Sequence, residues 1–317
     1  LTPTGGTVVA NTLNATNTSL VGQATITAGQ ATGGKAELYI GSTLVATDST
    51  IASTDTTVSF TTSDGTPTSA ELQALISAGG VASVKLYDAA GNVISSSVSN
   101  PSLTVDYVTP TVAITSDKTS FIAGQTATVS FTFSEAPTGF IAGDITTTGG
   151  LLSGLTASAD PKVYTALFTP TVNTNSLSGA IQLTGAYTDT AGNAGATSNT
   201  ISISGDTLAP TVTGVSETAA TIKAGGTAVF TLTMSEAVTI VGGTPTITLS
   251  TGETASYDSA TSSSTSLKFN YTAGASVNSS DVTVTAVNLG AASIKDAAGN
   301  DAEIGRASCR ERVSSPV

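Results

Sequence analysis

The chain repeats itself with a period of about one hundred residues, and this period limits what the chain can fold into. The segment DYVTPTV at residues 106–112 returns as DTLAPTV at residues 206–212. The segment AGQTATVSFTFSEA at residues 123–136 returns as AGGTAVFTLTMSEA at residues 224–237. A solenoid repeats every ~20–50 residues, so a period this long corresponds to a whole domain. The sequence therefore predicts domains connected in series.

A shorter motif, D-x-A-G-N, occurs once near the end of each predicted domain. Its three copies lie at residues 88–92, 189–193 and 296–300. From the repeats we predict three modules and a tail, with boundaries at residues 1–107, 108–206, 207–302 and 303–317. We expect the third module to be truncated, because a last strand should follow Asn300.

The C-terminal tail differs in composition from the rest of the chain. All three arginines and the single cysteine, Cys309, lie within residues 303–317. Residues 303–313 resemble a translated DNA-sequencing adapter, and the alternative is a genuine basic tail. We therefore leave the tail out of the fold argument and expect it to contribute nothing to the fold.

The composition excludes several classes of function. The net charge is −12, or −13 without the tail, and such an acidic surface repels nucleic acid and favours divalent cations. The chain has no histidine, and outside the tail it has no cysteine, so histidine-based catalytic triads, cysteine nucleophiles and His/Cys zinc sites are excluded there. We expect no catalytic activity, because the acidic side chains map to loops and linkers. We also expect no membrane insertion, since no run of ~18 apolar residues occurs.

Regular alternation of apolar and polar residues predicts β-strands. In the second module Val129, Phe131 and Phe133 share one face of a strand, and the third module repeats this pattern in residues 230–234. A period of two is typical of half-buried antiparallel strands. About seven short strands per module, with turn signals between them, predict a β-sandwich.

The first module follows the same pattern but contains one predicted helix. Ala36, Leu38 and Ile40 alternate up to a hairpin signal at Gly41, and Leu44 and Ala46 follow on the predicted return strand.

The predicted helix spans residues 69–78. Residues 68–71 form a capping box, and Leu72, Leu75 and Ile76 then have helical spacing. The fold class is therefore all-β, with modules arranged end to end and one short helix in the first.

The ordered set of motifs resembles the bacterial immunoglobulin-like (Ig-like) repeats. D-x-x-x-P-T-V begins a module, A-G-x-T with S-E-A lies on its second long strand, and D-x-A-G-N lies near its end. Modules two and three carry the whole set, whereas module one shares mainly the D-x-A-G-N turn. The resemblance implies an extracellular stalk, with calcium between the modules in many members.

The topology of an Ig-like sandwich brings the acidic side chains of each motif set to one end of a module. The loop after the second strand and the turn before the last strand lie at the same end as the linker that precedes the module. Carboxylate, amide and carbonyl oxygens are the ligands that calcium prefers. We therefore predict two calcium sites at the module junctions, formed by Asp106, Glu135, Asp189 and Asn193, and by Asp206, Glu236, Asp296 and Asn300.

A simpler interpretation of the same residues stays open. D-x-A-G-N is also a good turn, because Asp bonds its own backbone, Gly accepts positive φ and Asn tolerates the left-handed region. Asp106 and Asp206 would then only shape the approach to the following prolines.

For function we expect a structural stalk segment of a bacterial surface or secreted adhesin that extends a distal binding domain. The alternatives are a glycan- or protein-binding module and a spacer in a secreted multidomain enzyme. The expected partners are neighbouring Ig-like modules of a longer chain and, through other domains, a ligand on a host or biofilm surface.

Overall fold

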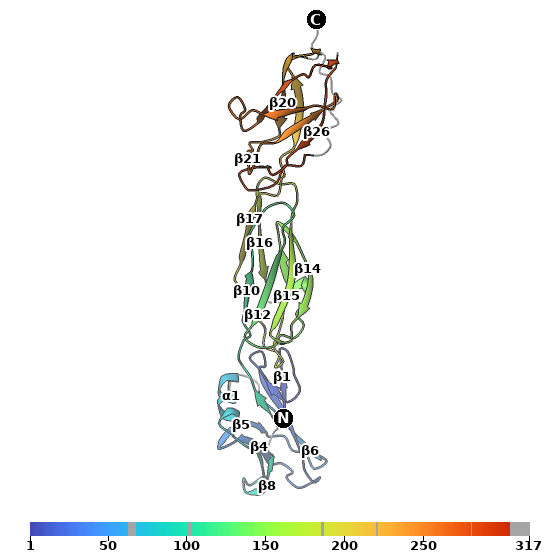
Figure 1. The fold of residues 1–317 in the computed structure, drawn as a ribbon. Helices are drawn as coiled ribbons and strands as arrows, with labels where there is room; N and C mark the ends of the chain where they lie inside the picture. Colours follow the sequence, from blue (N-terminus) through green and yellow to red (C-terminus); the bar gives the residue numbers. More distant parts are fainter. Residues whose placement is uncertain (63–67, 100–102, 185–186, 220, 280, 305–317) are drawn as a thin grey trace.

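Three β-sandwich modules follow one another along a single axis (Figure 1). The computed structural model describes residues 1–62, 68–99, 103–184, 187–219, 221–279 and 281–304. Three separate hydrophobic cores lie along the described chain, and their buried residues fall within residues 13–86, 112–203 and 222–294. The chain is therefore all-β apart from one α-helix and one 3-10 turn in the described residues, and the predicted fold class is confirmed.

The first module packs a three-stranded sheet (β1-β3-β6) against a four-stranded sheet (β5-β4-β7-β8), and a short parallel pair (β2-β9) leads out of it. Its elements are β1 (Thr2–Thr4), β2 (Thr12–Leu13), β3 (Ser19–Thr25), β4 (Lys35–Ile40), β5 (Thr43–Asp48), β6 (Thr57–Thr61), α1 (Ser69–Ser77), β7 (Ala82–Tyr87), β8 (Val93–Ser99) and β9 (Thr104–Val105). Helix α1 begins at the predicted capping box, in which Thr68 and Glu71 satisfy each other's backbone N–H groups.

A bulge in the predicted hairpin of the first module decides which side chains of its return strand face the core. The hairpin between β4 and β5 forms at Gly41 as predicted, but the register shifts by one residue between Leu38 and Tyr39. This bulge turns Val45 into the core and leaves Leu44 45% exposed. Leu44 therefore faces solvent on this confirmed return strand.

The second module consists of two four-stranded sheets, ordered β10-β12-β15-β14 and β11-β17-β16-β13. Its elements are β10 (Val112–Ser116), β11 (Ser120–Phe121), β12 (Ala127–Phe133), η1 (Ala142–Asp144), β13 (Ile145–Thr147), β14 (Gly150–Ala157), β15 (Val163–Pro170), β16 (Leu177–Leu183) and β17 (Ile201–Gly205). Val129, Phe131 and Phe133 of β12 are at most 3% exposed, which confirms the predicted inward face.

The third module has one six-stranded sheet, β18-β20-β24-β23-β22-β26, and two short strand pairs, β19-β25 and β21-β27. Its strands are β18 (Val212–Glu217), β19 (Ile222–Lys223), β20 (Thr227–Met234), β21 (Thr239–Val241), β22 (Thr246–Leu249), β23 (Thr254–Tyr257), β24 (Ser266–Thr272), β25 (Asn278–Ser279), β26 (Val284–Asn288) and β27 (Ser293–Lys295). Strand β20 buries Phe230, Leu232 and Met234, as its alternation predicts.

The first two residues of the tail belong to the fold, which corrects the expectation that the tail contributes nothing. The backbone N–H of Glu303 donates to the carbonyl of Pro210 at 2.9 Å, and Ile304 packs against the core of the third module. The N–H of Ala196 makes the equivalent bond to Pro110 in the second module. A backbone hydrogen bond can form with almost any side chain at that position, so an unusual sequence does not prevent it. Residues 305–317 lie outside the described residues.

Candidate metal centres at the module junctions

The first junction joins the first and second modules through the linker that begins at Asp106. Asp106 follows β9, which pairs with β2, and its backbone N–H donates to the carbonyl of Leu13 at 3.0 Å. Its carboxylate accepts a bond from the N–H of Val108 at 3.0 Å. The backbone of Asp106 is therefore held by the first module, while its side chain lies at the boundary with the second.

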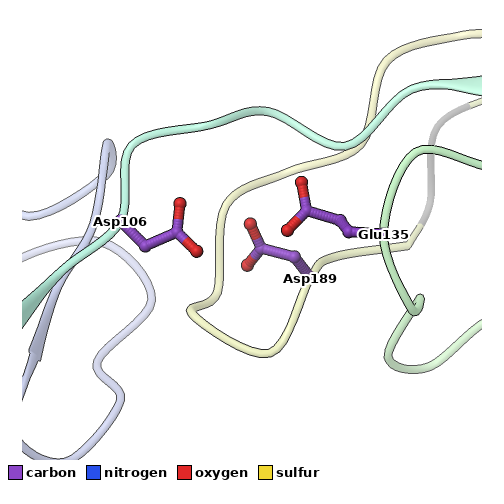
Figure 2. Close-up of side chains that lie close together, drawn as sticks. All are labelled: Asp106, Glu135 and Asp189. Atoms are coloured by element: carbon purple, nitrogen blue, oxygen red, sulfur yellow. The ribbon is translucent and has the colours of Figure 1, made fainter.

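The second module contributes two further carboxylates to this junction. Glu135 comes two residues after β12 ends, and Asp189 begins the D-x-A-G-N turn between β16 and β17. One carboxylate oxygen from each of Asp106, Glu135 and Asp189 lies within 4.8 Å of the others, and Figure 2 shows the three side chains pointing toward one another. The structure thus brings together the three acidic residues that the topology argument placed at one end of the module.

The second junction repeats this arrangement one module further along the chain. Asp206 follows β17, and its backbone N–H donates to the carbonyl of Phe121 at 3.0 Å. Glu236 follows β20, and Asp296 begins the turn after β27. These three carboxylates also approach within 4.8 Å of one another.

Electrostatics make both clusters unfavourable without a counter-charge. Burial raises the pKa of Glu135, and the carboxylates of Asp189 and Asp106 raise it further, while Lys162 opposes the shift. Burial likewise raises the pKa of Glu236, with further contributions from Asp296 and Asp206. Three carboxylates this close cannot all ionise without mutual repulsion unless a cation or a proton is present.

Glu236 gives a separate indication that its cluster fits a cation. Its Oε1 atom is buried and has no hydrogen-bond partner in the described part of the chain. A buried polar atom without a partner is costly, and a bound cation would remove that cost. The donor set consists of hard oxygen atoms, which match divalent cations of the calcium type. Both clusters can therefore hold a metal ion.

The two asparagines of the D-x-A-G-N turns lie at the junctions, where they bond across the module boundary. Asn193 is fully buried, and its Oδ1 accepts a hydrogen bond from the backbone N–H of Ala15 in the preceding module at 2.7 Å. Its Nδ2 donates to the carbonyl of Asp106 at 3.0 Å and to the carboxylate of Asp189 at 2.7 Å. Asn193 therefore connects the two modules through hydrogen bonds, and its role as a metal ligand stays a prediction.

Asn300 makes the same contacts at the second junction. Its Oδ1 accepts from the N–H of Ala123 at 2.6 Å, and its Nδ2 donates to the carbonyl of Asp206 and the carboxylate of Asp296. Each junction thus brings three carboxylates together, with one buried amide beside them that bridges the modules.

The sequence analysis missed Asn14 as a residue of the first junction. Asn14 is fully buried, and its Nδ2 donates to the carbonyl of Ala191 in the second module at 2.6 Å. Its Oδ1 accepts from the N–H of Thr16, which closes the loop that faces the second module. The available signal was a pair of asparagines three residues apart, Asn14 and Asn17, in a loop of small residues.

A comparison with protein families identifies the central part of the chain. Residues 106–204 match the family described as bacterial Ig-like domain. These residues form a bacterial Ig-like domain. In this Ig-like domain the match begins at Asp106 itself, so the linker carboxylate is part of the matched segment.

Solved structures similar to this Ig-like tandem include two bacterial adhesins and a tandem from titin. FdeC, an Escherichia coli adhesin, has 12% identity over 90% of this chain and 95% of its own, with a TM-score of 0.32. The Yersinia pseudotuberculosis adhesin InvE has 14% identity over 61% of this chain and 58% of its own, with a TM-score of 0.22. The I9–I11 tandem of titin has 9% identity over 86% of this chain and 93% of its own, with a TM-score of 0.25. A search of curated proteins gave no match. Among the described residues, no helix has the length and apolar character needed to cross a membrane.

Proposed function

We propose that this chain is a stalk segment of a bacterial cell-surface or secreted adhesin and that it extends a distal binding domain from its attachment point. The contacts across the junctions carry the proposal. At each junction a buried amide of one module bonds a backbone N–H group of the module before it, at 2.7 Å for Asn193 and 2.6 Å for Asn300. A linker fixed in this way limits bending, and Pro110 and Pro210 limit it further through their fixed φ.

Calcium stiffens both junctions in this proposal. The ligands at the first are Asp106, Glu135 and Asp189, and those at the second are Asp206, Glu236 and Asp296. The linker carboxylate belongs to a residue whose backbone is bonded to the preceding module, whereas the other two carboxylates belong to the following module. An ion that binds all three therefore connects two modules. Extracellular calcium modules bind in the range of about 10⁻⁴–10⁻³ M, which suits a location outside the cell.

Small-angle X-ray scattering tests the stalk role. Each sandwich is roughly 30 Å long from the strand rise, so three modules in line with their linkers form a rod of about 100–130 Å with a radius of gyration of about 35 Å. A single compact domain of 317 residues would have about 20 Å. We expect the larger value, and a value near 20 Å with and without calcium would remove the physical basis of the proposal.

Isothermal titration calorimetry with calcium tests the junction sites, with the Glu135→Gln and Glu236→Gln double variant as the control. We expect two binding events in the original chain and a strong reduction of both in the variant. Equal heats in the two proteins would show that the acidic clusters are not the calcium sites.

A further inference from the structure

The third module has a longer loop between two neighbouring strands than the second module has at the equivalent place. Strands β15 and β24 are equivalent because they pair with β12 and β20. Residues 158–162 connect β14 to β15, whereas residues 258–265 connect β23 to β24. A hairpin loop needs only about two to five residues, so the strand pairing does not require the extra length. Most residues of the longer loop are serine or threonine, so it adds hydroxyl groups to the surface of the module.

Hydrogen bonds hold this loop in one shape. The carboxylate of Asp258 accepts from the hydroxyl of Thr261 at 2.8 Å and from Asn270 Nδ2 at 3.0 Å. The hydroxyl of Ser262 donates to the carbonyl of Asp258 at 2.7 Å and accepts from the backbone N–H of Lys268 at 2.8 Å. A loop that is ordered before a ligand arrives loses little conformational entropy on binding.

The loop forms one side of a groove in the third module. The other side is β21 and the turn after it (Figure 1), and the groove has a volume of about 510 Å³. The N–H of Val238 donates to the carbonyl of Ser264 at 2.8 Å, which ties the loop to the segment before β21. The N–H of Tyr257 donates to the carbonyl of Pro245 at 3.1 Å, which ties β23 to the turn. Small-ligand sites measure about 300–1,000 Å³, so the groove is large enough for a small molecule.

The groove is lined by uncharged side chains, several of which carry free hydroxyl groups. Every described residue in its lining is uncharged. Six lining hydroxyl groups make no hydrogen bond within the described chain, and they belong to Thr239, Thr244, Tyr257, Ser259, Ser263 and Ser264. All of these residues except Tyr257 are exposed. Each hydroxyl can both donate and accept, so the rim of the groove can bond a ligand that does the same.

The groove also offers a flat apolar surface. The ring of Tyr257 packs against the buried ring of Phe269 in a T-shaped contact, with the ring centroids 5.7 Å apart. Ile240 lies half-buried in the same lining. A tyrosine held in this way presents an apolar face and a polar hydroxyl at its tip. The groove thus combines one fixed aromatic ring with a surrounding set of hydroxyl groups.

We propose that this groove, between residues 258–265 and β21, binds a neutral saccharide. A sugar ring has a C–H face that packs on an aromatic ring, and it has hydroxyl groups that donate and accept hydrogen bonds. The ring of Tyr257 takes the C–H face, and the serine and threonine hydroxyls of the lining bond the sugar hydroxyls. The groove belongs to the third module alone, so the inference depends neither on the stalk role nor on calcium.

Charge decides between a neutral saccharide and other ligands. An acidic sugar needs a cationic partner for its carboxylate, and the described lining of the groove offers none. The net charge of −12 also repels anionic ligands at longer range. An apolar ligand would cover the hydroxyl groups without replacing their bonds to water, which costs free energy. A neutral saccharide avoids both penalties.

The test measures saccharide binding to the whole chain by saturation-transfer NMR and calorimetry, with EDTA present. The neutral probes are maltotetraose, cellotetraose, mannotetraose and tetra-N-acetylchitotetraose, and the acidic probe is tetragalacturonate. We expect at least one neutral probe to bind with a Kd of about 1 mM or lower, and the acidic probe not to bind. Because EDTA removes calcium, failure of this test would leave the calcium and stalk proposals untouched.

Substitutions locate the binding site in the groove. Tyr257→Leu removes the flat ring and should weaken binding at least about tenfold, whereas Tyr257→Phe keeps the ring and should cost only about two- to fivefold. The double variant Ser263→Ala and Ser264→Ala should weaken binding at least about fivefold through lost hydrogen bonds. Ser256→Ala is the matched control, because Ser256 is exposed beside Tyr257 but lies outside the lining.

Thermal unfolding shows whether the third module of each variant is folded. The two serine substitutions lie at exposed positions, so they keep the test decisive if Tyr257→Leu unfolds the module. Three results would overturn the inference: no binding of any neutral probe, tighter binding of the acidic probe than of all neutral ones, or equal binding by the serine double variant and Ser256→Ala.

Discussion

The amide oxygen of Asn193 accepts a hydrogen bond from the backbone N–H of Ala15 at 2.7 Å, although 178 positions separate them in the sequence. The same amide group also bonds the carbonyl of Asp106 and the carboxylate of Asp189. One buried side chain thus connects a loop, a linker and a turn from both modules. These bonds connect the two modules without an ion.

We therefore predict that Asn193→Ala destabilises the first junction by about 2–4 kcal/mol, because it leaves several buried polar groups without partners. Chemical unfolding followed by hydrogen exchange at Ala15 measures the loss. The matched control is Asn92→Ala, which changes the same motif at an exposed position and should cost much less in the original chain. Equal losses for the two variants would mean that Asn193 acts only within its own turn.

The convergence of the carboxylates was predictable from the sequence because the topology of a sandwich allows little else. Once Glu135 follows the second long strand and Asp189 precedes the last one, both must lie at the end where the linker enters. The inward faces of β12 and β20 were predictable from the period-2 pattern, because only one face of each strand meets the opposite sheet.

The details that the sequence did not predict depend on local packing. The direction of the Asn193 amide depends on which groups of the preceding module lie beside it, and no pattern in the second module encodes this. The extra residue of the β5 bulge, Val45, turns into the core beside Ala46, and a single extra residue in the register leaves no clear trace in the alternation. Glu37 is buried within a strand because Lys35 and Tyr39 bond its carboxylate. These bonds lower its pKa to about 2.

The raised pKa of Glu236 gives a pH dependence with a definite sign. Burial and the neighbouring aspartates raise the pKa above its ordinary value of 4.5, so the folded state holds this proton more tightly than the unfolded state does. The associated stability is fully present below the unfolded pKa and is lost as the pH rises through the folded pKa. With EDTA present, thermal unfolding of the third module should show this decline as the pH is raised from 4 toward neutral.

The effect of Glu236→Gln on the stability of the third module should change sign between EDTA and calcium. In EDTA at pH ~7 the variant should be more stable than the original chain, because it removes one charge from the cluster. With calcium at about 100 times Kd the original chain should gain roughly 2.7 kcal/mol per site, and the variant should lose most of the gain at this junction. Glu217→Gln, at an exposed position of β18, is the matched control. A variant that is less stable than the original chain under both conditions would show that Glu236 has only a structural role.

The two junctions should differ in calcium affinity because of one lysine. Lys162 donates to the carbonyl of Ser134 at 3.0 Å, which places its positive charge next to Glu135 and opposes the rise in that residue's pKa. No lysine contributes to the pKa shift of Glu236. A nearby positive charge weakens cation binding, so the second junction should bind calcium about two- to fivefold more tightly at low salt. Calorimetry on Lys162→Ala should show that the calcium affinity of the first junction approaches that of the second. If the difference between the two affinities stays unchanged, Lys162 is not its cause.

The last prediction concerns where the fold of the third module ends. Two backbone hydrogen bonds tie residues after Asn300 to the third module. Ala302 N–H donates to the carbonyl of Ile294 at 2.8 Å, and Glu303 N–H donates to the carbonyl of Pro210 at 2.9 Å. Deleting residues 305–317 should therefore leave the thermal midpoint of this module unchanged. Deleting residues 303–317 should lower it by several degrees, because about 1 kcal/mol corresponds to roughly 4–8 °C in a domain of this size.

Two variants separate the contribution of the backbone from that of the side chains at this end. Glu303→Pro removes the N–H that Pro210 accepts, whereas Glu303→Ala keeps it, so only the proline variant should reproduce much of the loss seen on deleting residues 303–317. Ile304→Ala should account for part of the remaining drop in the thermal midpoint, since the Ile304 side chain packs against the core. If both deletions leave the midpoint unchanged, the bonded pair at Glu303 and Pro210 does not stabilise the module, and its fold needs nothing beyond Ala302. The expected result places the end at Ile304, where the last described side chain meets the core.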